Sequence, residues 1–241
     1  MAFFQQPSPI QPRWPIAIRP ETIATAEPET VITVRNNPEP WHLLDYTITT
    51  QNGTTLFTVH GHPWGLAQRR VFRDASGFAL FELRSRWYDS SILELKLPGS
   101  VANSATILSA KCRVAVQSPR VVMRFRNTCR PLESRPTQRY RHQNFLSRSS
   151  TQSSSYQEET VMEILALDVD NLVHVAMVDN QTLAVFNRVT NPEILAQGQK
   201  PPFRFRPMWT IRVARSVDLA LIAVAVVIIG QQVAGEVLVD Q

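Results

Sequence analysis

Histidine and aspartate side chains in two short stretches are the groups whose chemistry suits holding a metal ion or moving a proton. His60 and His62 stand two residues apart, so a strand would place both rings on one face, near Asp45 if the intervening hairpin pairs as expected. The second stretch, 168–174, carries two aspartates and a histidine around a turn, where carboxylates ordinarily bond to the backbone. Both arrangements are typical of hairpin ends, and we predict no metal and no cofactor.

Motifs of nucleophilic and phosphate-transfer enzymes are missing from the sequence. It has no G-x-S-x-G elbow, no glycine-rich phosphate loop and no H-E-x-x-H pair. The only cysteines, Cys112 and Cys129, provide neither a zinc-binding spacing nor a disulfide framework. We therefore predict that the protein is not an enzyme and has no catalytic residues.

Arginine is the residue type with the strongest bias in composition. Of the 25 Lys and Arg residues 22 are Arg, and the chain has a net charge of +5. Guanidinium groups bind carboxylates and phosphates through paired hydrogen bonds. In RVVMRFR and FRFR, strand alternation would place apolar side chains inside and arginines outside. With the earlier RR pair, the candidate residues for binding anionic lipid are Arg69, Arg70, Arg124, Arg126, Arg204 and Arg206.

The region 120–148 is especially basic, with eight arginines and one acidic residue, Glu133. One interpretation is a solvated surface whose arginines pair with acids such as Glu82 and Glu94. The other is a docking surface for phosphorylated head groups, since each basic residue near an anionic bilayer contributes about 1 kcal/mol. Nucleic acid is less favoured, because no recognition motif is present and aromatics on the face opposite the arginines form no stacking platform.

Short stretches of alternating polarity, separated by turn residues, must position these side chains. Asn52-Gly53 lies between LLDYTIT and TTLFTVH and suits a tight hairpin turn, and Gly77 ends a second turn of this kind. Such stretches recur about every ten residues with no helices between them. This spacing predicts an antiparallel sandwich or barrel and disfavours a parallel α/β sheet.

The most apolar stretch, Leu219–Ile229, is shorter than the roughly 20 residues of a membrane span. We predict no transmembrane span, with a tail anchor as the alternative. Ser216 suits an N-cap, Asp218 suits the positive end of the helix dipole, and Gly230 is a plausible stop. A helix apolar on every face must be surrounded by protein, so a helix over about 216–232 is expected to thread a closed barrel. Its predicted structural residues are Asp218, Leu221, Val224, Val227 and Ile228.

The domain organisation follows from composition. Residues 1–28, rich in Pro and Gln, are expected to form a disordered tail, and residues 131–157, rich in Ser and Arg, a disordered loop. A single barrel domain is expected over 29–235. The N-terminal residues lack the basic and apolar regions of a signal peptide. We expect a cytoplasmic protein, with association at membrane surfaces and the nucleus as further possibilities.

Three segments resemble the LURP-one-related (LOR) family, within the tubby C-terminal-like superfamily that also contains phospholipid scramblases. They are DYTITTQNGTTLFTVHG (45–61), RRVFRDASGFALFELR (69–84) and WTIRVARSVDLALIAVAVVI (209–228). The resemblance implies a mostly β fold: a closed antiparallel barrel of about 12 strands around a hydrophobic C-terminal helix. It implies no catalysis, and it favours phosphoinositide-type lipids over DNA. The chain lacks the cysteine-rich palmitoylation segments of membrane-linked members, which argues against a scramblase.

The function expected from these observations is that of a non-catalytic intracellular module. It would bind anionic phospholipid, or a protein partner, at a membrane surface. The alternatives are a protein–protein adaptor without lipid binding and a nucleic-acid-binding, transcription-associated protein.

Overall fold

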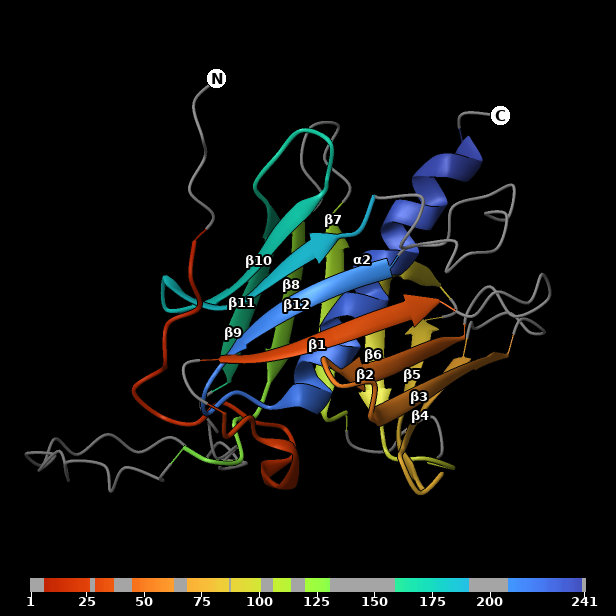
Figure 1. Cartoon of the computed structure of the whole chain (residues 1–241). Coiled ribbons are helices and arrows are strands. Elements are labelled where there is room, and N and C mark those ends of the chain that lie inside the picture. Colours follow the sequence, from red (N-terminus) through yellow and green to blue (C-terminus); the bar gives the residue numbers. More distant parts are fainter. Residues whose placement is uncertain are drawn as a thin grey trace, which may run out of the picture.

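The computed structural model is a mostly β structure in which a closed antiparallel barrel surrounds a C-terminal helix (Figure 1). The structure describes residues 7–26, 29–36, 45–62, 69–86, 88–100, 106–113, 120–130, 159–190 and 208–239. The fold class predicted from the sequence is therefore confirmed. The long loop expected at 131–157 lies outside the described residues.

Each strand pairs with the strands before and after it in the chain, and β12 closes the barrel by pairing with β1. All the remaining pairings join strands that are consecutive in the chain, so the sheet has no free edge among these strands. The strands in chain order are β1 (Glu29–Asn36), β2 (Tyr46–Thr50), β3 (Thr55–His62), β4 (Arg69–Asp74), β5 (Ala79–Arg86), β6 (Asp89–Lys96), β7 (Leu108–Arg113), β8 (Arg120–Phe125), β9 (Thr160–Ala166), β10 (Val173–Val178), β11 (Gln181–Arg188) and β12 (Met208–Ala214).

The two hairpin turns predicted at Asn52-Gly53 and Gly77 are present. Gly53 and Gly77 have φ of +82° and +85°, a backbone conformation that favours glycine. Asp179 and Asn180, which join β10 to β11, have φ of +50° and +61°, as a tight hairpin turn requires. These turns set the register that decides which side chains face the barrel interior.

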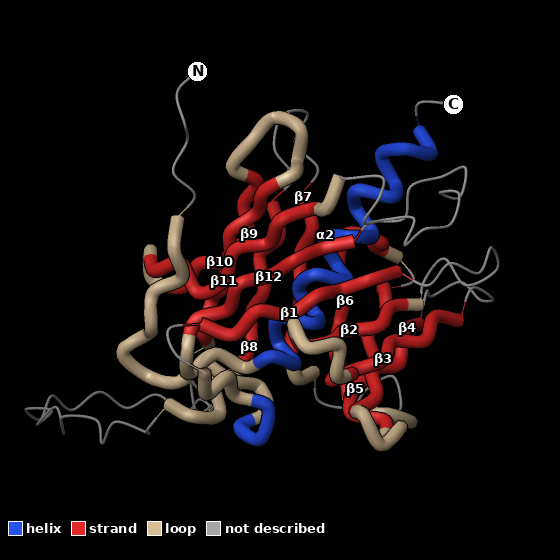
Figure 2. The backbone as a smooth tube through the Cα atoms, in the orientation of Figure 1, coloured by secondary structure: helices blue, strands red, loops and turns tan. Residues whose placement is uncertain are grey.

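The helix α2 (Leu219–Val239) runs through the barrel and fills it (Figures 1 and 2). Every residue from Leu221 to Ile228 is 0% exposed, which includes the predicted residues Val224 and Val227. Because strands surround the helix on all sides, it can be apolar on every face. Among the described residues no helix combines the length and apolarity that crossing a bilayer requires.

The ends of α2 differ from the prediction of 216–232. Ser216 is not the N-cap, because it has φ of +69° and lies in the turn before the helix. Asp218 caps the helix instead, and its Oδ1 accepts a hydrogen bond from the Ala220 N–H at 2.7 Å. Gly230 does not end the helix; it lies where a Cβ would be 3.2 Å from the Tyr46 hydroxyl oxygen, so glycine permits this close approach.

Residues 7–26 also differ from the disordered tail predicted over 1–28. Ile16, Ala17 and Ile18 are buried, and Ile16 and Ile23 form bridges with Val217 and Asp218. The short 3-10 helix η1 (Pro20–Thr22) lies within this segment. The prolines that suggested disorder here separate apolar residues that pack against the base of the barrel, where α2 begins. We call residues 15–24 the strap.

Candidate anion-binding face

Five basic side chains project outward from the hairpin of β7 and β8, and we call this set the basic face: Lys111, Arg113, Arg120, Arg124 and Arg126. The alternation of each strand explains their direction. In β8, Val121, Met123 and Phe125 are buried in the barrel while Arg124 is exposed. In β7, Leu108 and Ala110 are buried while Lys111 and Arg113 are exposed.

The strand register brings like charges together on the basic face. Arg113 lies directly opposite Arg120, an arrangement that destabilises an antiparallel pair. Arg120 is balanced by an ion pair with Glu163 of β9. Arg113, Arg124 and Arg126 form no ion pair with any residue in the described part of the chain.

Lys111 is the remaining member of the basic face. Hydrogen bonds from Ser91 are the main cause that lowers the pKa of Asp89, and the charge of Lys111 lowers it further. Lys111 therefore interacts with one acid at a distance but stays exposed. The face as a whole carries an excess of positive charge.

A second set of charges, on β4–β6, contrasts with the basic face because three of its arginines, Arg69, Arg84 and Arg86, form ion pairs. Glu82 forms ion pairs with both Arg69 and Arg84. Glu94 accepts a hydrogen bond from Arg86 Nε at 2.7 Å and lies 3.2 Å from the Lys96 ammonium. Arg69, one of the predicted lipid-binding residues, therefore shares the Glu82 carboxylate with Arg84.

Arg70 is not part of the outer surface, so its prediction as an outward lipid-binding residue is wrong. Its side chain is buried in the barrel, with 1% exposed, and burial lowers its pKa. Adjacent residues of a strand point to opposite faces, so Arg69 and Arg70 cannot both face outward. Arg70 Nη1 donates to Gln231 Oε1 of α2 at 2.6 Å.

The other predicted residues have different outcomes. Arg124 and Arg126 are exposed on one face of the barrel, as the alternation indicated. Arg204 and Arg206 lie outside the described residues. The sequence analysis missed Lys111 and Arg113, although the same alternation in LSAKCR would have found them.

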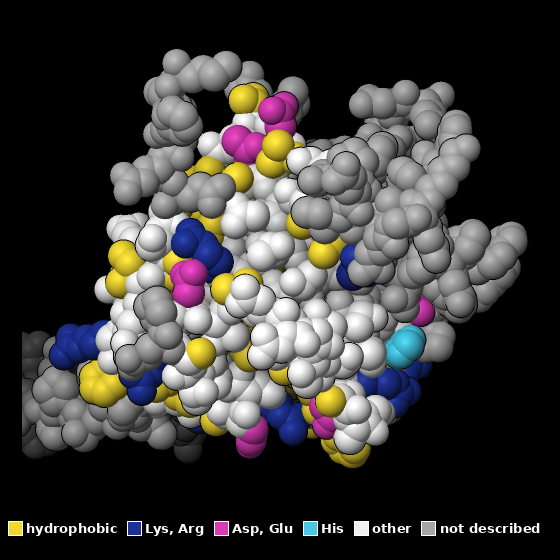
Figure 3. Space-filling view, in the orientation of Figure 1, with side chains coloured by type: hydrophobic (Ala, Val, Ile, Leu, Met, Phe, Trp, Pro, Cys, Tyr) yellow, Lys and Arg dark blue, Asp and Glu magenta, His cyan; other side chains and the backbone are white. Residues whose placement is uncertain are grey.

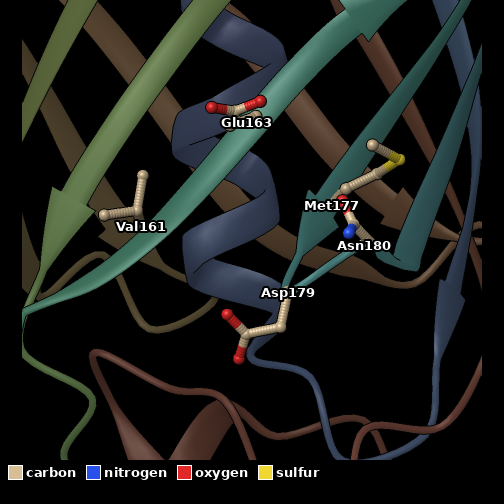
Figure 4. A pocket seen from close by; sticks show the side chains of 5 residues that line it. All are labelled: Val161, Glu163, Met177, Asp179 and Asn180. Atoms are coloured by element: carbon tan, nitrogen blue, oxygen red, sulfur yellow. The ribbon is translucent and has the colours of Figure 1, made fainter.

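A depression on the outer wall adjoins the basic face (Figure 4). It has a volume of about 220 Å³ and lies over β9, β10 and the turn after β10; its lining residues are Val161, Glu163, Met177, Asp179 and Asn180. Glu163 and Asp179 make it acidic, so it is unsuited to phosphate. Because Glu163 pairs with Arg120, the depression marks the border of the basic face.

The wall on the other side of the barrel has a different character. Figure 3 shows that the wall carrying β1 and β12 presents mainly uncharged side chains. Its Arg212 lies 3.7 Å from Glu29, so that charge is partly balanced. β1 lies halfway round the closed barrel from β7. The positive charge of the described residues is therefore unevenly distributed.

The histidine and aspartate stretches have structural roles. His60 Nδ1 lies 3.4 Å from Asp45 Oδ2, and Asp45 Oδ1 accepts a hydrogen bond from the Gly61 N–H. Asp168 accepts hydrogen bonds from the N–H groups of Leu172 and Val173, which is the turn role expected of it. Among the described residues no three His, Cys, Asp or Glu side chains are grouped to hold a metal.

A closed antiparallel barrel filled by its own C-terminal helix is the fold that the resemblance to the LOR family implied. The chain belongs to the LURP-one-related (LOR) family, whose model matches residues 30–196. The family predicted from the sequence is thus confirmed.

A solved structure shares this fold. It is an X-ray structure of a protein from Arabidopsis thaliana, with a TM-score of 0.51 and 17% sequence identity. The match covers 90% of this chain and 97% of the Arabidopsis chain. At this identity the likeness concerns the fold alone. No curated protein matches the chain at a significant level.

Proposed function

We propose that this LOR barrel is a non-catalytic module that docks on anionic phospholipid surfaces through the basic face. The observation that carries the proposal is a group of exposed arginines with no ion pair among the described residues, on adjacent strands of one wall. Opposed like charges reduce stability, and the Glu163 ion pair balances Arg120 but not Arg113, so a folding role alone does not account for the pairing of Arg113 with Arg120. A surface rich in phosphate groups would relieve that repulsion.

The expected strength of this attraction suits reversible docking. Each Lys or Arg close to an anionic bilayer contributes about 1 kcal/mol. The four members of the basic face other than Arg120 would together give about 4 kcal/mol, or roughly a thousandfold enrichment at the bilayer. A cytoplasmic protein held in this way associates peripherally, without inserting a helix.

Hydrophobic insertion does not contribute to this proposal. The large hydrophobic side chains that are exposed among the described residues all lie outside β7 and β8; they are Ile10, Trp14, Phe78, Tyr88, Leu97, Leu167 and Val169. Binding through the basic face would therefore be mainly electrostatic. Because salt screens exposed charges, it should weaken strongly between about 0.1 M and 0.5 M NaCl.

Vesicle flotation of the full chain tests the proposal. Vesicles of phosphatidylcholine alone are compared with vesicles that also contain phosphatidylserine or phosphatidylinositol bisphosphate, at both salt concentrations. We expect flotation only with the anionic vesicles and only at low salt. Reversing two charges, Arg124→Glu with Arg126→Glu, should reduce bound protein at least about tenfold.

Two control variants separate charge from position. Arg124→Lys with Arg126→Lys keeps the charge and should keep most of the binding. Thr49→Glu with Thr210→Glu adds negative charge beside β1, on the opposite wall, and should leave binding nearly unchanged. Unchanged flotation of the Arg124→Glu/Arg126→Glu protein would reject the basic face as the site. Absence of flotation together with binding to duplex DNA would favour a nucleic-acid-binding function instead.

A further inference from the structure

The end of the barrel from which α2 emerges contains a buried arginine that no acidic side chain of the described residues balances. Arg70 of β4 points into the barrel, where its guanidinium contacts Gln231 of α2. Tyr46 of β2 lies beside Gly230, one residue earlier in the helix. We call this region, defined by Tyr46, Arg70 and Gln231, the barrel mouth.

The guanidinium uses only part of its hydrogen-bonding capacity. Nη1 donates to the neutral amide oxygen of Gln231, whereas Nε and Nη2 are buried and have no hydrogen-bond partner within the described part of the chain. Nε and Nη2 lie along one edge of the planar group, and their N–H bonds point in nearly the same direction. This edge is the one that forms two parallel hydrogen bonds with the two oxygens of a carboxylate or phosphate.

The described neighbours of Arg70 supply no anion. The residue opposite on β5 is Leu83, and the residue opposite on β3 is Gly61, which contributes no side chain. The acid just before β2, Asp45, directs its carboxylate to the Gly61 N–H and to His60. A buried cation without a counter-charge is costly, and an anion bound along the unpaired edge would remove that cost.

We propose that the Nε–Nη2 edge of Arg70 binds an oxyanion, a carboxylate or a phosphate group, at the barrel mouth. Gln231 acts as a positioning residue, because its bond to Nη1 fixes the plane of the guanidinium, while the Nε–Nη2 edge has no hydrogen-bond partner among the described residues. This site is independent of the basic face, since Arg70 points inward and the basic face points outward.

Thermal unfolding of the full chain in different sodium salts tests the site. Inorganic phosphate and acetate are compared with chloride at matched ionic strength. The wild-type protein should show a saturable rise in Tm with at least one of the two anions, of about 3–6 °C at ten times its dissociation constant. Arg70→Met should abolish the rise, and Arg70→Lys should lose most of it, because an ammonium has no two-nitrogen edge.

Arg69→Met is the matched control. It removes the same type of side chain one position away, on the opposite face of β4, and should keep the full anion response. Phosphate also stabilises proteins by exclusion from their surface, but that general effect would be equal in all variants. An equal response in wild-type and Arg70→Met proteins, or no saturable response to either anion, would overturn the proposal.

The NMR signal of the Arg70 Nε–H gives a second readout, which is measured on the wild-type protein. It is assigned by its loss in Arg70→Met protein and should move during a phosphate titration of the wild-type protein. A fixed Nε–H signal would also overturn the proposal.

Inositol trisphosphate, used as a soluble head group, distinguishes a lipid head group from free phosphate as the ligand. A response to free phosphate as strong as to the head group supports a small-anion site, and a much stronger response to the head group supports a lipid ligand. Arg70→Met should leave electrostatic flotation through the basic face unchanged, so the two proposals fail separately.

Discussion

Each end of the barrel buries an ionisable side chain, and the two side chains differ in how completely they are hydrogen-bonded. At the base, the Asp218 carboxylate accepts hydrogen bonds from Ile18 N–H at 3.0 Å, Arg19 N–H at 2.8 Å, Ala220 N–H and the Thr22 hydroxyl. At the mouth, the Arg70 guanidinium has one neutral partner and two nitrogens that no described residue pairs. The base is thus a satisfied polar network, and the mouth is an unsatisfied one.

Two further buried groups near the mouth are also unpaired within the described part of the chain. Arg70, His174 and Trp209 are each the second residue of a strand, and β4, β10 and β12 run in the same direction, so all three lie near the mouth. His174 Nδ1 and Trp209 Nε1 are also buried without a hydrogen-bond partner among the described residues. Buried polar groups are nearly always paired in folded proteins. The Asp218 network therefore stabilises the base, and the proposed anion site lies at the end where these buried polar atoms are unpaired by any described residue.

The helix that connects the two ends should tolerate no charge in its middle. Ala225 is 0% exposed and lies in the part of α2 that strands surround. Ala225→Asp places an unpaired carboxylate there and should cost more than about 4 kcal/mol, enough to unfold the barrel. Circular dichroism and limited proteolysis measure the loss. Ala75→Asp, in the exposed turn before Gly77, is the control and should fold normally.

A folded Ala225→Asp protein that loses only membrane attachment would contradict the interior position of α2. It would instead support the tail anchor that the apolar segment alone left as an alternative.

Removing the carboxylate at the base should have the next largest effect. Asp218→Ala leaves the buried N–H of Ile18 and the part-buried N–H of Arg19 unpaired and removes the helix cap, so we expect a loss of about 3–5 kcal/mol. Urea denaturation measures it. Asp74→Ala removes an exposed turn carboxylate that also accepts several hydrogen bonds, and it should cost clearly less. Equal losses in the two variants would show that the strap does not depend on Asp218.

Low pH should reduce the stability of the folded protein, because His174 is buried near the mouth in its neutral form. Burial lowers the pKa of His174 from 6.5 to about 4, so the unfolded chain binds a proton that the folded protein excludes. Stability is therefore lost as pH falls from about 6.5 towards 4, by up to about 3 kcal/mol. His174→Phe should remove this pH dependence. Phe186→Leu, opposite on β11, should lower stability by the same amount at each pH; a slope unchanged in His174→Phe would contradict the assignment.

The smallest expected effect is the change in stability caused by Arg70→Met, and its sign distinguishes the mouth from the base. In chloride, Arg70→Met removes an unbalanced buried charge and should leave the protein as stable as the wild type or more stable by about 1–2 kcal/mol. Urea denaturation of the Arg70→Met and Asp218→Ala proteins under the same conditions compares their free energies of unfolding. A loss as large as that of Asp218→Ala would mean that Arg70 is a structural group like Asp218.

Much of the barrel could be predicted because its signals are local. Gly53 and Gly77 mark turns within four residues of the strands they join, and alternation in β8 shows which side chains face inward. The apolar run of α2 could be placed in the interior, since no other environment suits a helix without a polar face. These features depend on periodicity and turn geometry, which a sequence displays directly.

The errors arose where distant segments meet. The strap is ordered because Ile16 and Ile18 pack against residues about 200 positions later, a pairing that no local pattern reveals. Gly230 resembles a helix stop, but contact with Tyr46 gives it a different role. The ion pair of Arg69 with Glu82 depends on strand register, and Arg70 was misplaced because strand alternation was not applied to the RR pair.

An NMR titration can map where the folded protein contacts an anionic lipid. Backbone amide NMR of the full chain is recorded during titration with a soluble short-chain phosphatidylinositol bisphosphate at low salt. We predict that shifts concentrate on β7 and β8, at Lys111, Arg113, Arg124 and Arg126, and disappear at high salt. Binding that leaves these amides unshifted, or shifts centred on the wall of β1 and β12, would contradict the account.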